Sequence, residues 1–194
     1  LLKLPKGEIV IVTGFCVNGR PETDGPVGAY FLAQALRELG FYPVIATDCC
    51  KDLFFDLPLG SVTSKTVSVI SIERCGATED GRYLNMRGVC IDSDTKPLDN
   101  LLKLPLPTFA FGDGGNEAGM GNIAYEIKTH LNIEPSVVTC DHLIVATVSN
   151  WGVYGLLTYL DKLPDTDRVI KYIEHILSKG AVDGVTGQSI PTVD

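Results

Sequence analysis

Five short apolar runs, rich in β-branched residues, predict the strands of a buried sheet. Each run is continuous rather than alternating, which is typical of parallel strands covered on both faces. The runs cover residues 8–15, 42–48, 65–73, 107–111 and 135–140.

Between and after these runs, apolar residues recur at helical spacing. This spacing predicts helices over 24–40, from about 116 to 131, and over 165–180. Asp24 and Pro26 suit the start of the first helix. Residues 142–160 are ambiguous at their start, because LIVATV also suits a strand; the length of the segment and Asp141 as an N-cap favour a helix.

The alternation of strands and helices predicts an α/β fold. We expect an open, mostly parallel sheet flanked by helices on both faces, a Rossmann-like three-layer sandwich, with residues 1–194 as a single domain. The connection 49–64 has no convincing helical pattern and the connection 92–105 is short for a right-handed crossover, which indicates shortened loops or residues absent from this chain. Residues 181–194 predict a turn-rich segment or a short hairpin.

The composition of the chain argues against some classes of binding partner. The net charge of −8 argues against nucleic acid and against an anionic membrane surface, since neither would be attracted. No apolar stretch approaches the roughly 20 residues that a membrane span needs. The six cysteines include no CxxC pair, which favours buried free thiols over disulfides or a zinc site. The negative charge is compatible with metal binding, or merely with solubility.

Carboxylates follow every predicted strand. In an open parallel sheet, ligands bind in the crevice beyond the carboxyl ends of the strands, so these groups should gather there. One such residue alone is commonly a helix cap, but a cluster must be neutralised by a proton, an arginine or a cation. Mg²⁺ or Mn²⁺ held by oxygen ligands would do so, as would ion pairs with Arg74 or Arg87. The carboxylates are Glu22, Asp24, Asp48, Glu73, Asp113, Glu117 and Asp141.

The stretch GDGGNEAGMGN at 112–122 raises the question of a phosphate loop. It has no lysine, which a phosphate loop requires, and the dinucleotide motif GxGxxG fails because Glu117 stands where its third glycine should be. The variant GxGxxA matches at 119–124, but that match begins inside the predicted helix. No bound nucleotide is therefore expected. The glycines instead allow close approach of the backbone while Asp113, Asn116 and Glu117 project into the crevice. A tight turn with Asn116 as N-cap is the alternative.

Other polar residues have two interpretations each. Asn85 and Arg87, on a loop, suit either a planar carboxylate ligand or a surface ion pair. Asn150, within an apolar helix, either satisfies neighbouring backbone or reaches a ligand. His142, beside Asp141 at a predicted strand end, is the histidine with a credible catalytic role.

Six blocks of the chain resemble the D-glutamate cyclase family, in the family's order and over nearly the whole chain. They are PETDGPVGA (21–29), ERCG (73–76), NMRG (85–88), GDGGNEAGMGN (112–122), DHLIVATVSNWG (141–152) and VDGVTG (182–187). The chain departs from the family in Ala118, where a bulkier aliphatic is expected, and in compressed spacing before ERCG and GDGG. The resemblance implies conversion of D-glutamate to 5-oxo-D-proline and water in the mitochondrial matrix. It also implies a longer polypeptide with another domain ahead of this one.

The chemistry of that reaction suggests a role for each candidate. Asp113 and Glu117, completed by Asp24 or Glu22, are the expected ligands of a divalent cation. Glu73 or His142 would act as base and then acid. Arg74 and Arg87 would bind the substrate α-carboxylate, with Asn85, Asn116 and Asn150 as further binding groups. A metal-dependent hydrolase using the same crevice, or a non-catalytic domain that senses an amino acid or metal, are the alternatives.

Overall fold

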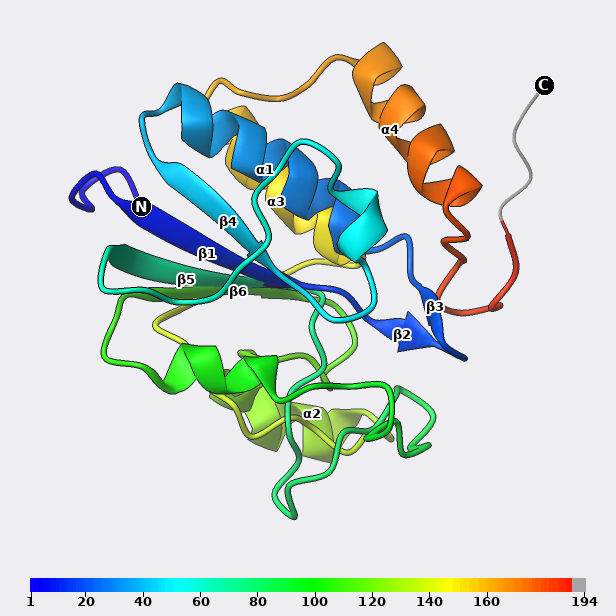
Figure 1. Cartoon of the computed structure of the whole chain (residues 1–194). Coiled ribbons are helices and arrows are strands. Elements are labelled where there is room, and N and C mark those ends of the chain that lie inside the picture. The colour runs from blue at the N-terminus through cyan, green and yellow to red at the C-terminus, as the bar shows by residue number, and fades with distance from the viewer. Residues whose placement is uncertain (190–194) are drawn as a thin grey trace.

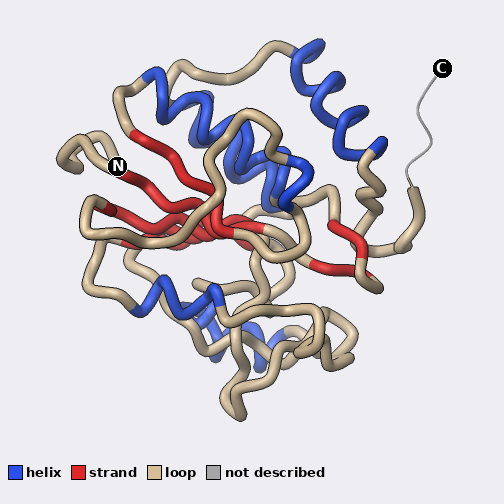
Figure 2. The backbone as a smooth tube through the Cα atoms, in the orientation of Figure 1, coloured by secondary structure: helices blue, strands red, loops and turns tan. Residues whose placement is uncertain are grey.

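The computed structural model of the protein describes residues 1–189, and its centre is a parallel sheet (Figures 1 and 2). The five strands lie in the order β4-β1-β5-β6-β7 and all pair in parallel. They are β1 (Glu8–Thr13), β4 (Tyr42–Ala46), β5 (Thr66–Ile72), β6 (Thr108–Gly112) and β7 (His142–Val145). A small antiparallel hairpin, β2 (Cys16–Val17) with β3 (Arg20–Pro21), follows β1.

Helices cover both faces of the sheet, which confirms the predicted three-layer α/β class (Figure 1). On one face lie α1 (Pro26–Glu38) and α3 (Ser149–Tyr159), with α4 (Thr166–Ser178) packed on α1. On the other lie α2 (Ala124–His130) and the 3₁₀ helix η2 (Leu98–Lys103). Two shorter 3₁₀ helices complete the set: η1 (Lys51–Leu53), between β4 and β5, and η3 (Met120–Ile123), which leads into α2.

Strand β1 shows why the apolar runs predict a sheet buried on both faces. Ile9 and Ile11 belong to the larger core beneath α1 and α3, whereas Val10 and Val12 belong to the smaller core on the opposite face. All four side chains are fully buried. Successive residues of a strand point to opposite faces, so only an uninterrupted apolar run can fill both cores.

The strand order creates a crevice beside β1. The chain leaves β1 through α1 to reach β4 on one side, and later strands are added on the other side, beginning with β5. Loops after β1 and β5 therefore diverge at this point, which is where open α/β sheets bind ligands. Glu22 and Asp24 follow β1 and Glu73 follows β5, so three of the predicted carboxylates flank the crevice.

The predicted fifth strand was wrong, and so was the start of the following helix. Residues 135–140 are neither helix nor strand, while His142–Val145 forms β7 and α3 begins only at Ser149. The Val138 carbonyl instead accepts hydrogen bonds from the backbone N–H groups of Gly119 (2.8 Å) and Gly121 (3.0 Å), which takes this segment out of the sheet.

Asp141 is likewise no helix cap. Its carboxylate accepts hydrogen bonds from the backbone N–H (2.8 Å) and hydroxyl (3.0 Å) of Thr108. Because Thr108 begins β6 and Asp141 immediately precedes β7, this contact joins the amino ends of the two strands. Asp141 therefore lies at the edge of the sheet opposite to the crevice.

The helix predicted from about residue 116 begins later than expected. Gly119 has a φ of 106°, a left-handed conformation that ends any helix attempted from Asn116, and α2 starts at Ala124. By contrast, α1 and α4 confirm the helices predicted over 24–40 and 165–180. Of the predicted C-terminal turns, 183–188 is seen and residues 190–194 lie outside the described residues.

Candidate active site

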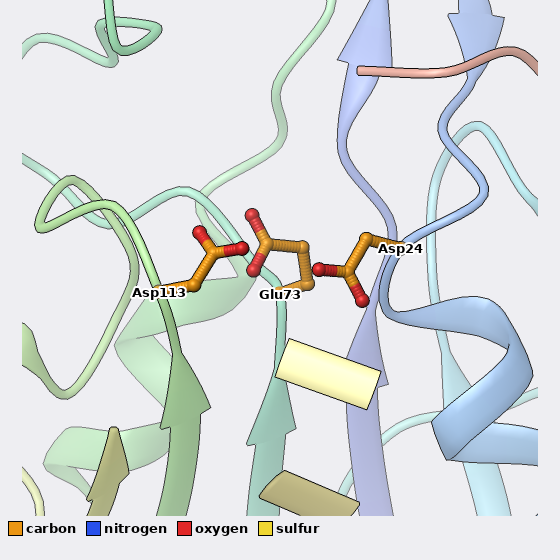
Figure 3. Close-up of side chains that lie close together, drawn as sticks. All are labelled: Asp24, Glu73 and Asp113. Atoms are coloured by element: carbon orange, nitrogen blue, oxygen red, sulfur yellow. The ribbon is translucent and has the colours of Figure 1, made fainter. Parts of the chain in front are cut away.

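Carboxylates from three strand ends meet at the carboxyl edge of the sheet. Figure 3 shows Asp24, Glu73 and Asp113 turned toward one another, and each offers an oxygen within 4.8 Å of the others. Glu22 and Glu117 complete the cluster, since their charges act on the same groups. The prediction that these carboxylates gather is confirmed for all five.

Glu73, like Glu117, is a buried member of the cluster. It is 5% exposed and follows β5 directly. Its φ of 45° lies in the left-handed region, which is strained for a glutamate and is favoured near functional sites. The hydroxyl of Ser149 donates a hydrogen bond to its Oε2 at 2.5 Å.

The position of the Glu117 side chain explains why the GDGGNE stretch needs its glycines. Its Oε1 accepts a hydrogen bond from the backbone N–H of Gly114 (2.9 Å) and its Oε2 accepts one from Gly115 (2.7 Å). A Cβ on Gly114 would lie 2.8 Å from Glu117 Oε1, and one on Gly112 would lie 3.1 Å from Oε2. The loop is thus a nest of amides that resembles a phosphate loop but binds its own glutamate.

Burial raises the pKa of all five carboxyl groups. The pKa of Glu22 and that of Asp113 are both raised to about 8, by burial first and then by the neighbouring carboxylates. The pKa of Glu73 is raised well above its ordinary value for the same reasons. For Asp24 and Glu117 burial raises the pKa, and hydrogen bonds from backbone amides partly offset it. At neutral pH the cluster therefore attracts protons or a cation.

The contacts of Arg74 correct the expectation that it binds a ligand. It is 1% exposed and donates to both carboxylate oxygens of Asp48, at 2.7 Å each, and to the carbonyls of Gly14 and Lys96. The strong pairing lowers the pKa of Asp48. Asp48 therefore follows its strand as predicted, but its carboxylate pairs with Arg74 and does not join the cluster.

A cavity of about 410 Å³ opens onto the cluster. Besides the carboxylates, the lining includes residues 15–18 and two loops: the turn that carries Asn85 and Arg87, and the segment 184–187. Arg87 Nη2 donates to the Val185 carbonyl at 2.7 Å, which ties the two loops together. Asn85 Oδ1 accepts from the N–H groups of Arg87 and Val89, so this side chain shapes the turn.

Asn116 also lines the cavity and is buried, and its Nδ2 donates to the Leu84 carbonyl at 2.9 Å. It therefore anchors the Asn85–Arg87 turn to the glycine-rich loop. It is not the N-cap of a helix, because no helix begins there.

Two predicted site residues have other contacts than a ligand-binding role requires. His142 is exposed at the amino end of β7, far along the strand from the cluster, and stacks on Phe109 with ring centroids 4.8 Å apart. Its expected place in the crevice depended on the incorrect strand at 135–140. Asn150 satisfies neighbouring backbone, as one of its two interpretations predicted: its Oδ1 accepts from the N–H groups of Gly25 (3.1 Å) and Gly28 (2.7 Å).

One site residue was missed from the sequence. Ser149 is fully buried and contacts Glu73. The available signal was the polar pair Ser149–Asn150 in an apolar segment, which was ascribed to Asn150 alone.

Three oxygen ligands at the spacing of Asp24, Glu73 and Asp113 suit a hard divalent cation. The lone pairs that Asp24 and Glu117 do not use for backbone amides remain able to coordinate. The residues thus fit such an ion, and they fit an ammonium group by the same charge argument.

Comparison with known sequences places this site in a family. Residues 2–67 and 57–194 match the family model described as "D-glutamate cyclase-like, C-terminal". The chain belongs to this family. The two matched stretches overlap at 57–67, where the chain makes its short connection from β4 to β5. The family predicted from the sequence blocks is confirmed.

A human relative, named "D-glutamate cyclase, mitochondrial", is 29% identical to the chain over 234 residues. The match covers 95% of this chain and 38% of the human protein, so the chain spans well under half the length of that relative. The printed name of the human relative describes an enzyme whose substrate is a small molecule. Within residues 1–189, none of the helices has the length and apolarity required to span a bilayer.

Proposed function

We propose that this chain converts D-glutamate to 5-oxo-D-proline and water. The observation that carries the proposal is the meeting of Asp24, Glu73 and Asp113, with an oxygen of each within 4.8 Å of the others, beside a cavity that Glu73 and Asp113 line. The family supports it, because the human relative is named D-glutamate cyclase. D-Glutamate carries one ammonium and two carboxylate groups, and the cavity combines acidic side chains with the guanidinium of Arg87.

The reaction conserves protons overall. A bond forms between the α-nitrogen and the γ-carbon, and a carbon–oxygen bond of the γ-carboxyl group breaks. The nitrogen loses two protons, and the departing oxygen gains two to leave as water. One group that accepts a proton at nitrogen and donates it at oxygen therefore suffices.

Glu73 has the position for this proton transfer. It is buried at the centre of the cluster, and its raised pKa allows it to hold a proton near neutral pH. His142, the other candidate, lies at the opposite edge of the sheet. Glu73 is therefore proposed as base and then acid.

Asp113 and Glu117, with Asp24 or Glu22, are proposed to hold a cation. The cation is either Mg²⁺ or Mn²⁺, or the substrate ammonium itself, since both relieve the repulsion within the cluster. A bound divalent ion would polarise the γ-carboxyl group for attack. The amide nest around Glu117 holds that carboxylate in place before any ligand arrives.

Arg87 is proposed to bind the α-carboxylate. Its guanidinium already donates to a carbonyl oxygen at the cavity, Val185 O, and a substrate carboxylate would offer it a charged acceptor instead. Asn85 and Asn116 act indirectly by fixing the turn that carries Arg87. Holding the substrate folded, with amine and γ-carboxyl group in contact, supplies much of the catalysis.

The human relative's name also supports a place of action. We propose that the chain works in the mitochondrial matrix as part of a longer protein.

Incubation with D-glutamate, 5-oxo-D-proline and p-nitrophenyl phosphate, with and without Mn²⁺, tests the function by proton NMR and absorbance. We expect formation of 5-oxo-D-proline from D-glutamate. Hydrolysis of the phosphate ester alone would indicate a metal-dependent hydrolase. Thermal stabilisation by D-glutamate without turnover would indicate a binding domain.

Substitution of the cluster tests the site. We expect Asp113→Asn and Glu117→Gln to lose most of the activity and any bound metal. Asp80→Asn is the control, because Asp80 is exposed and pairs with Arg82 away from the cavity. Full activity and metal content in both cluster variants would refute the assignment.

A further inference from the structure

Ser149 is a buried serine that the proposed chemistry leaves without a role. Its side chain is fully enclosed, and its hydroxyl lies 2.5 Å from Glu73 Oε2. It does not line the cavity, so it does not touch the substrate. Its backbone N–H donates to Asp24 Oδ2 at 2.9 Å, which makes Ser149 a neighbour of two cluster carboxylates at once.

Glu73 needs such a partner more than Glu117 does. Its backbone is fixed: its N–H donates to the Phe111 carbonyl at 3.1 Å, and a Cβ on Gly25 would lie 2.7 Å from its own Cβ. Beyond Cβ, however, the side chain still rotates about several bonds. Glu117 is held by two backbone amides, whereas among residues 1–189 the hydrogen bond recorded to the Glu73 carboxyl is the one from Ser149.

A hydroxyl is well suited to this contact. It donates to a carboxylate and accepts from a carboxylic acid, so the contact persists through proton transfer. Ser149 is also the first residue of the eleven-residue helix α3, whose N-terminal end favours negative charge nearby. Its place is set by the helix, which makes it a rigid support.

We propose that Ser149 is a positioning residue that holds the Glu73 carboxyl group beside Asp24 and Asp113. The effect that we expect on kcat rests on the proposed function. The effect that we expect on the position of the Glu73 side chain rests on geometry alone. Loss of the hydroxyl leaves the backbone hydrogen bond to Asp24 intact, so the change acts on Glu73 specifically.

The kinetic test compares Ser149→Ala with Ser149→Thr, which keeps the hydroxyl. We expect the alanine variant to lower kcat for D-glutamate by about 10- to 100-fold with little change in KM, because misplacing a catalytic group by about 1 Å costs about that much. The threonine variant should recover most of the rate. Ser178→Ala is the control, since Ser178 bonds a carbonyl within α4. An unchanged kcat, or equal loss in both Ser149 variants, would overturn the proposal.

Crystal structures of the wild type and Ser149→Ala provide a test that needs no turnover. We expect the Glu73 side chain to leave its place, or to occupy several rotamers, in the variant. If it stays, Ser149 does not position it, whatever the kinetics show. If the wild type does not turn over D-glutamate, the proposed function fails, and these structures still decide the role of Ser149. Should the alanine variant not fold, Ser149→Cys takes its place in both tests.

Discussion

Asp24, just before α1, caps the start of α3, and Asn150, at the start of α3, caps the start of α1. Asp24 precedes α1, yet its carboxylate accepts from the N–H groups of Ser149 (2.9 Å) and Asn150 (2.8 Å), at the start of α3. Asn150 Oδ1 in turn accepts from Gly25 and Gly28 at the start of α1. This exchange fixes two helix N-termini against each other at the edge of the acidic cluster. Their partial positive charges favour the carboxylates there.

Replacing Asn150 by alanine should destabilise the protein. It removes the single oxygen, Oδ1, that accepts two hydrogen bonds at the start of α1, and it leaves the Thr23 carbonyl without its amide donor. Losing one helix cap costs about 1 kcal/mol, so we expect a loss of about 2 kcal/mol in the free energy of unfolding, measured in urea. Asp165→Ala, which removes the single cap of α4, is the comparison and should cost about half as much. Equal or smaller loss in Asn150→Ala would contradict the shared cap.

Stability should fall as pH rises from about 4.5 to about 8. The pKa of Glu22 is raised from 4.5 to about 8, and that of Asp113 from 3.8 to about 8, so in this window the folded state binds protons that the unfolded state has released. Such groups contribute stability at low pH and lose it as pH passes through their folded pKa.

Thermal unfolding in EDTA buffers from pH 5 to 9 measures this dependence. Asp113→Asn should flatten the curve by removing one carboxylate, whereas Asp80→Asn should not, because Asp80 is exposed and away from the cluster. In the same buffers without EDTA, free Mn²⁺ at about 100 times its Kd should restore about 2.7 kcal/mol, with most effect on the melting temperature at high pH. A stability that is constant or rising across this range would show that the carboxylates do not repel one another.

The fold and the acidic crevice could be predicted because both follow from local pattern. The run around Ile11 is apolar on both faces, and Glu73 and Asp113 come directly after such runs. An ion pair of Arg74 with a strand-end carboxylate was one of the interpretations of the sequence, but Asp48 could not be singled out as the partner, because the two residues lie 26 positions apart and nothing local marks them as a pair. The segment around Val138 was wrongly predicted to be a strand for a different reason. It is as β-branched as β7, and only the backbone of Gly119 and Gly121 decides which of the two joins the sheet.

Gly114→Ala should damage the site although it adds a single methyl group. The new Cβ would lie 2.8 Å from Glu117 Oε1, so the nest around that carboxylate must open. We expect at least a tenfold fall in kcat/KM for D-glutamate, about the cost of displacing a site group by a fraction of an ångström.

Gly155→Ala is the matched control. Gly155 lies within α3 and has no atom within 4 Å of an added Cβ, so alanine should be neutral there or stabilise by about 0.4–1 kcal/mol. Comparison of activity and unfolding in the two variants separates the nest from a general effect of replacing glycine. Full activity in Gly114→Ala would show that the Glu117 carboxylate is not needed in its present place.

Arg87→Ala should raise KM for D-glutamate more than it lowers kcat. Arg87 lines the cavity with the cluster carboxylates, and its guanidinium is the group proposed to bind the α-carboxylate. A charge-assisted hydrogen bond contributes about 1.5–3 kcal/mol, which corresponds to a rise of about 10- to 100-fold in KM. Arg87→Lys should recover only part of this, because lysine does not pair with a carboxylate in the bidentate way. Arg82→Ala serves as control, since Arg82 is half exposed and pairs with Asp80 outside the cavity. A KM unchanged in Arg87→Ala would assign the α-carboxylate to another group.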